Sequence, residues 1–540
     1  MKMKRMLAIL LAACLMLALA ACGNKGDTTA TTTAGDAETT TTVAGDGEVA
    51  DGEGTTEAGA TETTVTDKEG NVVTTTTQKG ATTRKTKNLI GITTQTIGGS
   101  TVAGGQLAVG APITIKEGTV PCEKGKSGNG QTFTYAYYGS SWNEKHKGWF
   151  AEFEKKYNCK IDVKGLPSSE YVAGLSAAMA GGSPYDLVFL HGFDYPSQIT
   201  ANVMMPLNDY ITTADLWNSK SLTSGGGFSK SLMEATSLNG NIYSIAGTYL
   251  NTPAAIYYNK KIFKDAGFDG AEDPVALYKA GKWTWEKLYD MLTEIQDPSK
   301  GLYGMNTISP YADHTFVNSY GTDLAKLRND GKLVQNLGDR QLYKAFEMLQ
   351  KYSFGEHRVT DPKNPFENGR DQFLNGTTAT WLYNVGQYNG VVTLMDQQTY
   401  SAFGTKAQQK SNLGCVPLPI ANSQGLHPIW YWIGYGVGNG ASDAGRDFAL
   451  AFAKYDSTVN VGMTFDEKVM PAELCQMSRD IMDKDKLIGP MGGFESSAGS
   501  FSGTMVTLSS KIAIKGANVT VTLKAYEKVV QTLIDTALKA

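Results

Sequence analysis

The sequence has few of the residues that build catalytic and metal sites. Only five histidines and six cysteines occur among 540 residues. No two cysteines have the CxxC spacing typical of metal clusters, and the sequence contains neither HExxH nor GxSxG. The GKS at residues 125–127 lacks the leading glycine of a phosphate-binding loop. We therefore expect no metal ion and no cofactor, and we assign no catalytic residue.

Aromatic residues are absent from residues 23–87, which consist mostly of Thr, Gly, Ala, Asp and Glu. Such a segment cannot bury enough apolar surface to offset its ordering entropy, so we predict a disordered linker. A flexible chain of this length reaches on the order of 45 Å. Residues 88–129 are less polar but rich in glycine, and their pattern fits short strands as well as a continuation of the linker.

The N-terminus carries three basic residues, then an apolar stretch from Met6 to Ala21, then Cys22. This order is typical of an export signal rather than of folded structure. Leu19, Ala20, Ala21 and Cys22 resemble the bacterial lipoprotein signal, which implies cleavage after residue 21 and lipidation of Cys22. The alternative, an uncleaved membrane helix, needs about 20 apolar residues, and the stretch is shorter.

The formal net charge is −4, and it becomes −7 without Lys2, Lys4 and Arg5. A mildly acidic chain is a poor partner for nucleic acid and for anionic lipid. Beyond the N-terminal signal the cysteines are Cys122, Cys159, Cys415 and Cys475. Four cysteines allow three pairings, and the sequence does not choose among them.

From about residue 130 onward, short apolar strands alternate with amphipathic helices. Residues 131–139 and 160–165 have the pattern of strands, and residues 142–158 place aromatic side chains at helical spacing. This alternation predicts an α/β fold with a mainly parallel sheet covered on both faces. About 410 residues exceed what one core normally supports, so we expect two lobes.

The order of short motifs along this part resembles the family 1 extracellular solute-binding proteins, the maltodextrin and multiple-sugar receptors of ABC importers. The motifs are, in order, FEKKYNCKIDV, AAMAGGSPYDLVFL, MMPLNDYI, LNGNIYSIAG, AAIYYNKKIFKDAGFD, WTWEKLYDML, FLNGTTATWLYN, GCVPLPIANSQG and IGYGVGNGASDAGRDFALAFAKY. The resemblance implies a two-lobe periplasmic-binding-protein-like fold with a hinge and an interlobe cleft. It also implies a carbohydrate ligand, an ABC permease as partner, and a monomer on the extracellular face of the membrane.

These features predict the following organisation: a signal peptide over 1–21, a lipid-anchored linker over 22–87, an extended segment over 88–129, and a bilobal domain over 130–540. We expect lobe 1 to contain about 130–252 and 386–430, and lobe 2 about 253–385 and 431–540.

Ligands of open α/β sheets collect at the carboxyl ends of strands, so the loops there supply the candidate residues. Rings and hydrogen-bonding groups follow several predicted strands. The candidates are Tyr138, Trp142, His191, Asp194, Tyr249, Asn251, Trp381, Tyr383 and Gln387. For each of them, packing in the core or capping of a turn is the alternative.

The run PIWYWIGYG, residues 428–436, concentrates four aromatic residues. In an extended chain, Tyr435 and Val437 would share a core face, while Trp430 and Trp432 would share the other face with Gly434 and Gly436. We expect open space beside the two glycines and a sugar stacked on the indoles. The resemblance favours Trp432 as the ligand-facing tryptophan. It also implies that Glu495, in the C-terminal part, can reach the ligand.

Three alternatives to a saccharide receptor remain open. The first is a receptor for another polar solute, such as a peptide or a polyamine. A lipid-anchored glycan hydrolase needs only two suitably spaced carboxylates, which no motif excludes. A passive glycan adhesin would need a flat binding face and no hinge.

Overall fold

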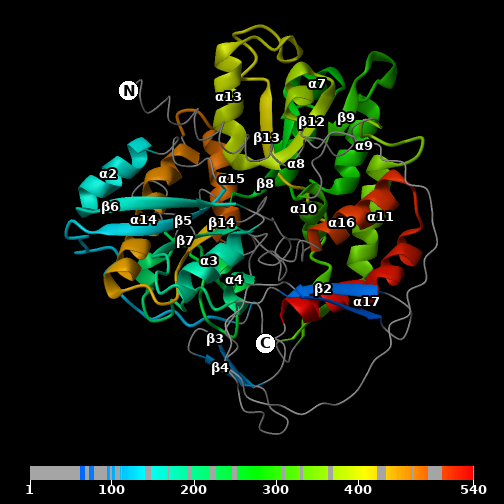
Figure 1. Ribbon diagram of the computed structural model, residues 1–540. Helices are drawn as coiled ribbons and strands as arrows, with labels where there is room; N and C mark the ends of the chain where they lie inside the picture. The colour runs from blue at the N-terminus through cyan, green and yellow to red at the C-terminus, as the bar shows by residue number, and fades with distance from the viewer. Residues whose placement is uncertain are drawn as a thin grey trace. The chain divides into compact units, whose positions relative to one another are not determined.

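The structure is a computed structural model of the chain. It describes residues 61–66, 72–77, 94–97, 100–103, 110, 112–139, 147–167, 170–191, 197–217, 227–245, 252–306, 311–328, 332–362, 369–421, 433–464, 467–483 and 501–538. The chain divides into two compact units, one of residues 19–93 and one of residues 1–18 with 94–540. Each unit is described by itself below, and Figure 1 labels the elements.

The smaller unit contains one antiparallel pair, β1 (Thr61–Thr66) with β2 (Val72–Thr77). We expected no regular structure here. The exception has a local reason, because both strands are rich in the β-branched residues Thr and Val, which favour extended backbone. A second short pair, β3 (Thr94–Ile97) with β4 (Ser100–Ala103), belongs to the larger unit.

The larger unit contains two four-stranded sheets. The first has the order β14-β7-β5-β6, in which β5 runs parallel to β6 and β7, and β14 runs antiparallel to β7. Its strands are β14 (Ile433–Val437), β7 (Leu187–His191), β5 (Thr132–Tyr138) and β6 (Lys160–Leu166). The predicted strands at 131–139 and 160–165 are confirmed.

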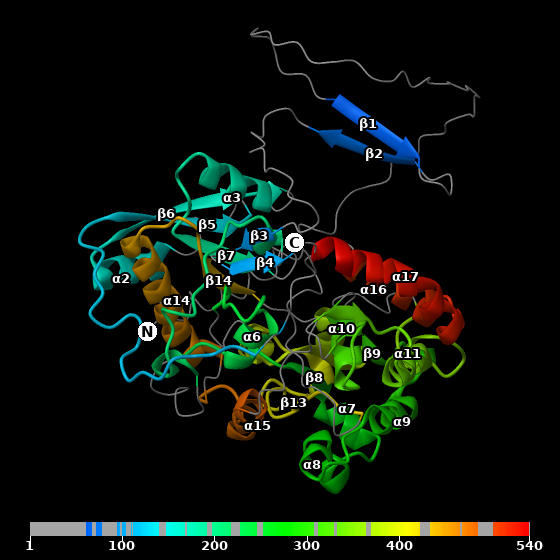
Figure 2. The ribbon, with the colours of Figure 1, turned by 90° about the horizontal axis from the view of Figure 1, so that it is seen from below.

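Helices cover both faces of the first sheet (Figure 2). Phe133 and Tyr135 of β5 pack against aromatic residues of α2 (Lys147–Tyr157) and α14 (Asp443–Thr464). Ala136, on the opposite face, belongs to the cluster that contains Tyr171 and Leu175 of α3 (Tyr171–Ala180). The short helix α4 (Ser197–Thr200) follows β7 in the chain, and α6 (Lys230–Ala235) comes later. Alternate side chains of β5 and β7 therefore enter different clusters, as a sheet buried on both faces requires.

The second sheet has the order β13-β8-β12-β9, in which β12 runs parallel to β9 and antiparallel to β8. Its strands are β13 (Leu413–Pro417), β8 (Ala254–Asn259), β12 (Thr378–Asn384) and β9 (Tyr303–Asn306). The accompanying helices are α7 (Lys260–Asp265), α8 (Pro274–Lys279), α9 (Trp285–Ile295), α10 (Tyr311–Ser319), α11 (Arg340–Ser353), α12 (Arg370–Asn375) and α13 (Tyr388–Gln397). A small pair, β10 (Ala325–Leu327) with β11 (Leu333–Gln335), lies between α10 and α11 in the chain.

The C-terminal helices belong with the second sheet. They are α15 (Ala472–Asp483), α16 (Phe501–Ser509), a π-helical turn (Ser510–Ile514) and α17 (Val519–Ala537). The Gln350 side chain on α11 donates to the backbone oxygens of Ile512 and Ala517, at 2.8 and 3.0 Å. The Gln335 backbone N–H on β11 donates to Gln531 Oε1 on α17 at 3.0 Å. These bonds connect the end of the chain to elements 162 to 196 residues earlier.

The pairing of β13 and β14 corrects the expected lobe boundaries. We placed 386–430 in lobe 1 and 431–540 in lobe 2, yet β13 pairs with β8 of the second sheet and β14 pairs with β7 of the first. The chain therefore returns to the first sheet between β13 and β14, and it leaves again after α14. Both strands are short and apolar, so their own sequences did not reveal which sheet they complete.

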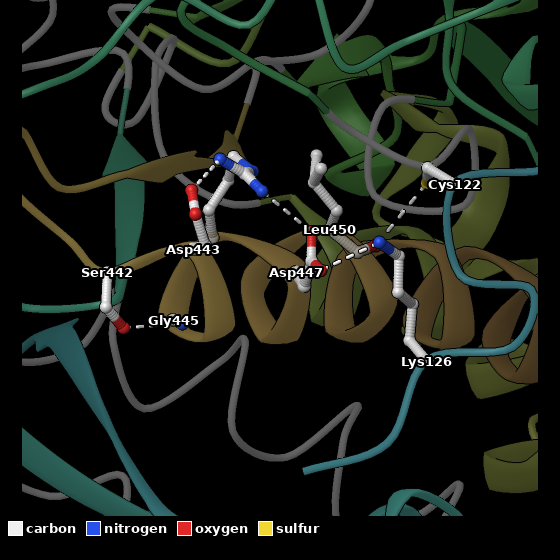
Figure 3. A network of polar contacts seen from close by, with 8 residues as sticks. Cys122, Lys126, Ser442, Asp443, Gly445, Asp447 and Leu450 are labelled. Carbon is white, nitrogen blue, oxygen red and sulfur yellow. Dashed lines mark hydrogen bonds and ion pairs between the residues drawn. The ribbon is translucent and has the colours of Figure 1, made fainter.

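Residues 112–129, expected to be part of an extended segment, lie against the first sheet's helices. Ile113 is buried in that core. The Lys126 ammonium pairs with Asp447 on α14 at 2.7 Å (Figure 3). The Cys122 Sγ lies 4.0 Å from the Leu450 backbone oxygen. These contacts, with the bond from the Cys122 N–H to Asp215, fix the segment to α14 and to the 209–215 region, although its glycine content favoured no regular element.

Cys122, Cys159, Cys415 and Cys475 all lie within the described residues, and none of them forms a disulfide in the structure. Burial raises the pKa of the Cys159 thiol to about 11, and burial raises that of Cys415 further. Among the helices that the structure describes, none combines the length and the apolar character needed to cross a membrane.

Candidate functional site

The carboxyl ends of β5 and β7 lie at the same edge of the first sheet. β5 ends at Tyr138 and β7 ends at His191, and the two strands run parallel. Ile433, the first residue of the antiparallel β14, lies opposite His191. Three predicted ligand-binding segments therefore adjoin the same edge, where ligands of open α/β sheets bind.

Tyr138 is the predicted site residue at this edge whose side chain the structure describes. Its ring is half-buried and meets the Tyr171 ring edge-on, with centroids 5.1 Å apart. For His191 the structure describes the backbone but not the side chain. Several other predicted residues lie outside the described residues; they are Trp142, Asp194, Tyr249, Asn251, Trp430, Trp432 and Glu495, together with Cys22.

The alternation predicted for residues 433–437 is correct on one face. Tyr435 and Val437 are buried in the core with α14. The open space expected beside Gly436 is absent, because a Cβ at that position would meet Met204 Cε at 1.7 Å and the Tyr243 backbone oxygen at 3.0 Å. The glycine therefore admits the Met204 side chain, and our expectation of open space beside Gly436 was wrong.

Two predicted aromatic residues of the second sheet lie in its core. Trp381 and Tyr383 lie two residues apart on the same face of β12, and their rings stack 4.8 Å apart with an interplanar angle of 20°. The Trp381 ring also lies 5.0 Å from Tyr257 on β8. Trp381 is 1% exposed and Tyr383 is 3% exposed. Gln387, which follows β12 in a short 3₁₀ turn, is partly exposed.

The carboxyl ends of β9, β12 and β13 and the start of β8 share one edge of the second sheet. Hydrogen bonds join the start of β8 to the end of β12. The Val385 backbone N–H donates to the Pro253 oxygen at 3.0 Å, and the Tyr257 hydroxyl donates to the backbone oxygens of Asn384 and Val385 at 2.8 and 3.1 Å. Burial raises the pKa of Tyr257 well above its ordinary value, which keeps this hydroxyl a donor.

Sequence reasoning missed two buried carboxamides near these edges. Asn306 is the last residue of β9, and Gln198 lies in α4, seven residues after β7 ends. Both are 0% exposed, and neither the nitrogen nor the oxygen of either side chain has a hydrogen-bond partner. An unpaired buried polar group costs about 1–3 kcal/mol. The position after a strand end was the signal available in the sequence, and it did not distinguish these residues from others.

One group of possible metal ligands occurs among the described residues. Donor atoms of Cys122, Glu123 and Asp215 lie within 4.8 Å of one another. However, the Asp215 carboxylate accepts the backbone N–H groups of Cys122 and Thr212, at 2.7 and 2.9 Å. Burial, and then the nearby Asp215, raise the pKa of the Cys122 thiol well above its ordinary value. The Lys454 ammonium, which donates to the Asp215 backbone oxygen at 3.0 Å, adds positive charge, so the group is better suited to fixing the 112–129 segment than to binding a cation.

Comparison with solved structures identifies the fold. The sugar-binding protein MalE from Xanthomonas citri is 14% identical, with a TM-score of 0.56, over 75% of this chain and 98% of that one. The galacto-N-biose-/lacto-N-biose I-binding protein of the ABC transporter from Bifidobacterium longum is 13% identical, with a TM-score of 0.53, over 76% and 98%. The GacH receptor of Streptomyces glaucescens is 15% identical, with a TM-score of 0.51, over 75% and 98%.

Among curated proteins, none matches this chain in sequence. The model of the bacterial extracellular solute-binding protein family matches residues 139–455. This match spans more than half of the chain and includes strands of both four-stranded sheets. The two-lobe α/β fold expected from the sequence is confirmed by the sheets and by the similar structures. The chain belongs to the bacterial extracellular solute-binding protein family.

Proposed function

We propose that this chain is the receptor of an ABC importer, and that it captures a saccharide and delivers it unchanged to a membrane permease. The family match is the observation that carries the proposal. The ligands of similar structures support the saccharide: acarbose for the GacH receptor, lacto-N-biose for the Bifidobacterium protein, and cycloalternan for a Listeria monocytogenes protein of TM-score 0.50. A saccharide offers hydroxyls and an apolar face, and both suit the residues predicted at the strand ends.

The binding mechanism that we propose follows from the two-sheet architecture. The carboxyl edges of both sheets face a shared cleft, and a ligand that touches both edges stabilises the closed arrangement of the lobes. The segments 252–253 and 384–386, joined by the bonds around Tyr257, form part of the hinge. The permease then recognises the closed form.

The predicted ligand-binding residues remain those of the strand ends. Trp432 precedes β14, and Asp194 follows β7. In our proposal their side chains contact the sugar, Trp432 by stacking and Asp194 by accepting hydroxyls. Trp381 and Tyr383 support the edge from within the core, where their rings are stacked.

We further propose that the receptor is anchored outside the cell through lipidated Cys22, with residues 23–87 as its linker. The basic, apolar and small-residue order of the first 22 residues supports this localisation. Metabolic labelling with a palmitate analogue tests it. We expect label on the wild type and no label on Cys22→Ala, which would also leave the membrane fraction. Equal labelling of both proteins would contradict the anchor.

A thermal-shift screen of the full-length protein tests the proposed ligand class. The panel contains maltotriose, lacto-N-biose, cycloalternan, dipeptides and polyamines. A ligand that binds only the folded state stabilises it by about 2.7 kcal/mol at 100 times its Kd, so a hit raises the melting temperature measurably. We expect saccharides to be the hits. Stabilisation by a peptide or polyamine alone would replace the saccharide with another polar solute.

A further inference from the structure

Asn306 and Gln198 stand apart from every other carboxamide that the structure describes. They are the two whose nitrogen and oxygen are both buried and both without a hydrogen-bond partner. Each side chain is 0% exposed. Native proteins pair more than nine in ten of their buried polar groups, so two wholly unpaired carboxamides require an explanation.

Other buried carboxamides of this chain are paired in the ordinary way. Asn259 is also 0% exposed, yet its nitrogen donates to the Ala402 oxygen at 2.9 Å and its oxygen accepts the Lys261 N–H at 3.0 Å. Gln409, again 0% exposed, donates to the Gln398 oxygen at 3.1 Å and accepts the Tyr400 N–H at 3.0 Å. The fold is therefore able to satisfy a buried carboxamide where the role is structural.

The positions of the unpaired carboxamides connect them with the proposed binding edges. Asn306 ends β9, and its partner in the parallel register is Trp381, whose indole Nε1 is likewise buried and unpaired. Gly369 makes room beside it, since a Cβ there would lie 2.6 Å from Asn306 Cβ. Gln198 is in the first helix after β7. One unpaired carboxamide thus lies at the carboxyl end of β9 in the second sheet, and the other lies shortly after the carboxyl end of β7 in the first. Ligands of such folds bind at carboxyl strand ends.

The chemistry of a carboxamide fits a neutral hydroxylated ligand. Its nitrogen donates two hydrogen bonds and its oxygen accepts up to two, while each hydroxyl both donates and accepts. Two neighbouring hydroxyls of a sugar can therefore satisfy one carboxamide without any charge. Resting on the saccharide receptor function, we propose that Asn306 and Gln198 are ligand-binding residues, one from each sheet, which hydrogen-bond sugar hydroxyls.

The proposal predicts opposite effects on stability and on affinity. Replacing an unpaired buried carboxamide by an apolar side chain of similar size removes a desolvation cost from the free protein. The same change removes hydrogen bonds to the sugar. For Asn306→Leu and Gln198→Met we expect an equal or higher melting temperature without ligand, and a Kd at least tenfold weaker for the saccharide. If a leucine side chain does not fit beside Gly369, Asn306→Ala is measured in its place.

Asn259→Leu and Gln409→Met are the matched controls, because their carboxamides are paired within the fold. We expect both controls to lower the melting temperature and to leave the Kd within about twofold, as loss of a purely structural hydrogen bond would. Calorimetric titration with the strongest saccharide of maltotriose, lacto-N-biose and cycloalternan supplies the Kd of each full-length variant.

Two results would overturn the inference alone: wild-type affinity in Asn306→Leu and Gln198→Met, or a loss of melting temperature like that of the controls. The second result would indicate that ordered water pairs these groups in the free protein. A wild type that binds none of the three saccharides would instead overturn the proposed function, and this inference with it.

Discussion

Two buried asparagines at opposite edges of the second sheet differ in the hydrogen bonding of their side chains. At the edge where β8 ends, Asn259 caps α7 and has its carboxamide paired with three backbone groups, those of Lys261, Ile262 and Ala402. At the edge where β9 ends, Asn306 is equally buried and unpaired. The comparison teaches that the fold pairs the polar groups that it needs for its own stability. Polar groups left unpaired at a carboxyl edge are candidates for contacts with something outside the chain.

The paired edge gives the largest expected effect. Asn259→Leu removes the N-cap of α7 and leaves the Ala402 carbonyl without its partner. The free energy of unfolding should fall by about 2–4 kcal/mol, the sum of a lost cap and an unpaired buried group. Urea denaturation measures it. A change below about 0.5 kcal/mol would mean that the two edges do not differ as the structure indicates.

The edge of the first sheet, where Trp432 precedes β14, should respond in affinity instead of stability. Trp432→Ala removes the indole that we expect to stack on the sugar, so binding should weaken tenfold or more, about 1.4 kcal/mol or more. The melting temperature of the free protein should stay nearly unchanged. An equal loss of stability would show that the Trp432 side chain is part of the core.

The first sheet sharpens the comparison at β14. Gly436→Ala places a Cβ against Met204, and overpacking of this kind costs about 1–3 kcal/mol. The double variant Gly436→Ala with Met204→Ala should destabilise less than the two single changes added together, because the second change makes room for the first. Simple additivity of the two unfolding free energies would argue against the contact.

The smallest expected effect is that of alkaline pH on the free energy of unfolding. Burial raises the pKa of Cys159 from an ordinary 9.0 to about 11. The contribution of the buried neutral thiol is fully present below pH 9, and it is lost as pH rises from 9 to 11 because the unfolded state ionises first. Between these two pH values the wild type should lose about 1–2 kcal/mol more stability than Cys159→Ala. Equal losses would mean that this thiol ionises normally.

The sequence was sufficient for strands of the first sheet, though not for β1 and β2, and it did not reveal which strands pair over long range. The strands at 131–139 and 160–165, and the core face of Tyr435 and Val437, were predicted by periods of two, because burial sets that alternation locally. The membership of β13 and β14 in their sheets depends on pairing with β8 and β7, which lie far away in the chain. No local pattern contains that information.

The candidate site shows the same division. The sequence predicted that the segments after β5 and β7 adjoin one edge, because chain direction alone places the ends of parallel strands at one edge. What fills the space beside Gly436 is Met204, more than 200 residues earlier, and alternation could not predict it. The unpaired state of Asn306 and Gln198 is a property of all their neighbours together, so it became visible only in the folded chain.

The most direct test of a receptor that binds a sugar and returns it intact combines binding with recovery. The full-length protein is titrated with its best saccharide from the screen, incubated, denatured, and the sugar is analysed by mass spectrometry. We predict binding at about micromolar Kd, near −8 kcal/mol, and a recovered saccharide of unchanged mass. Shortened fragments of the sugar would contradict the account and indicate a glycan hydrolase.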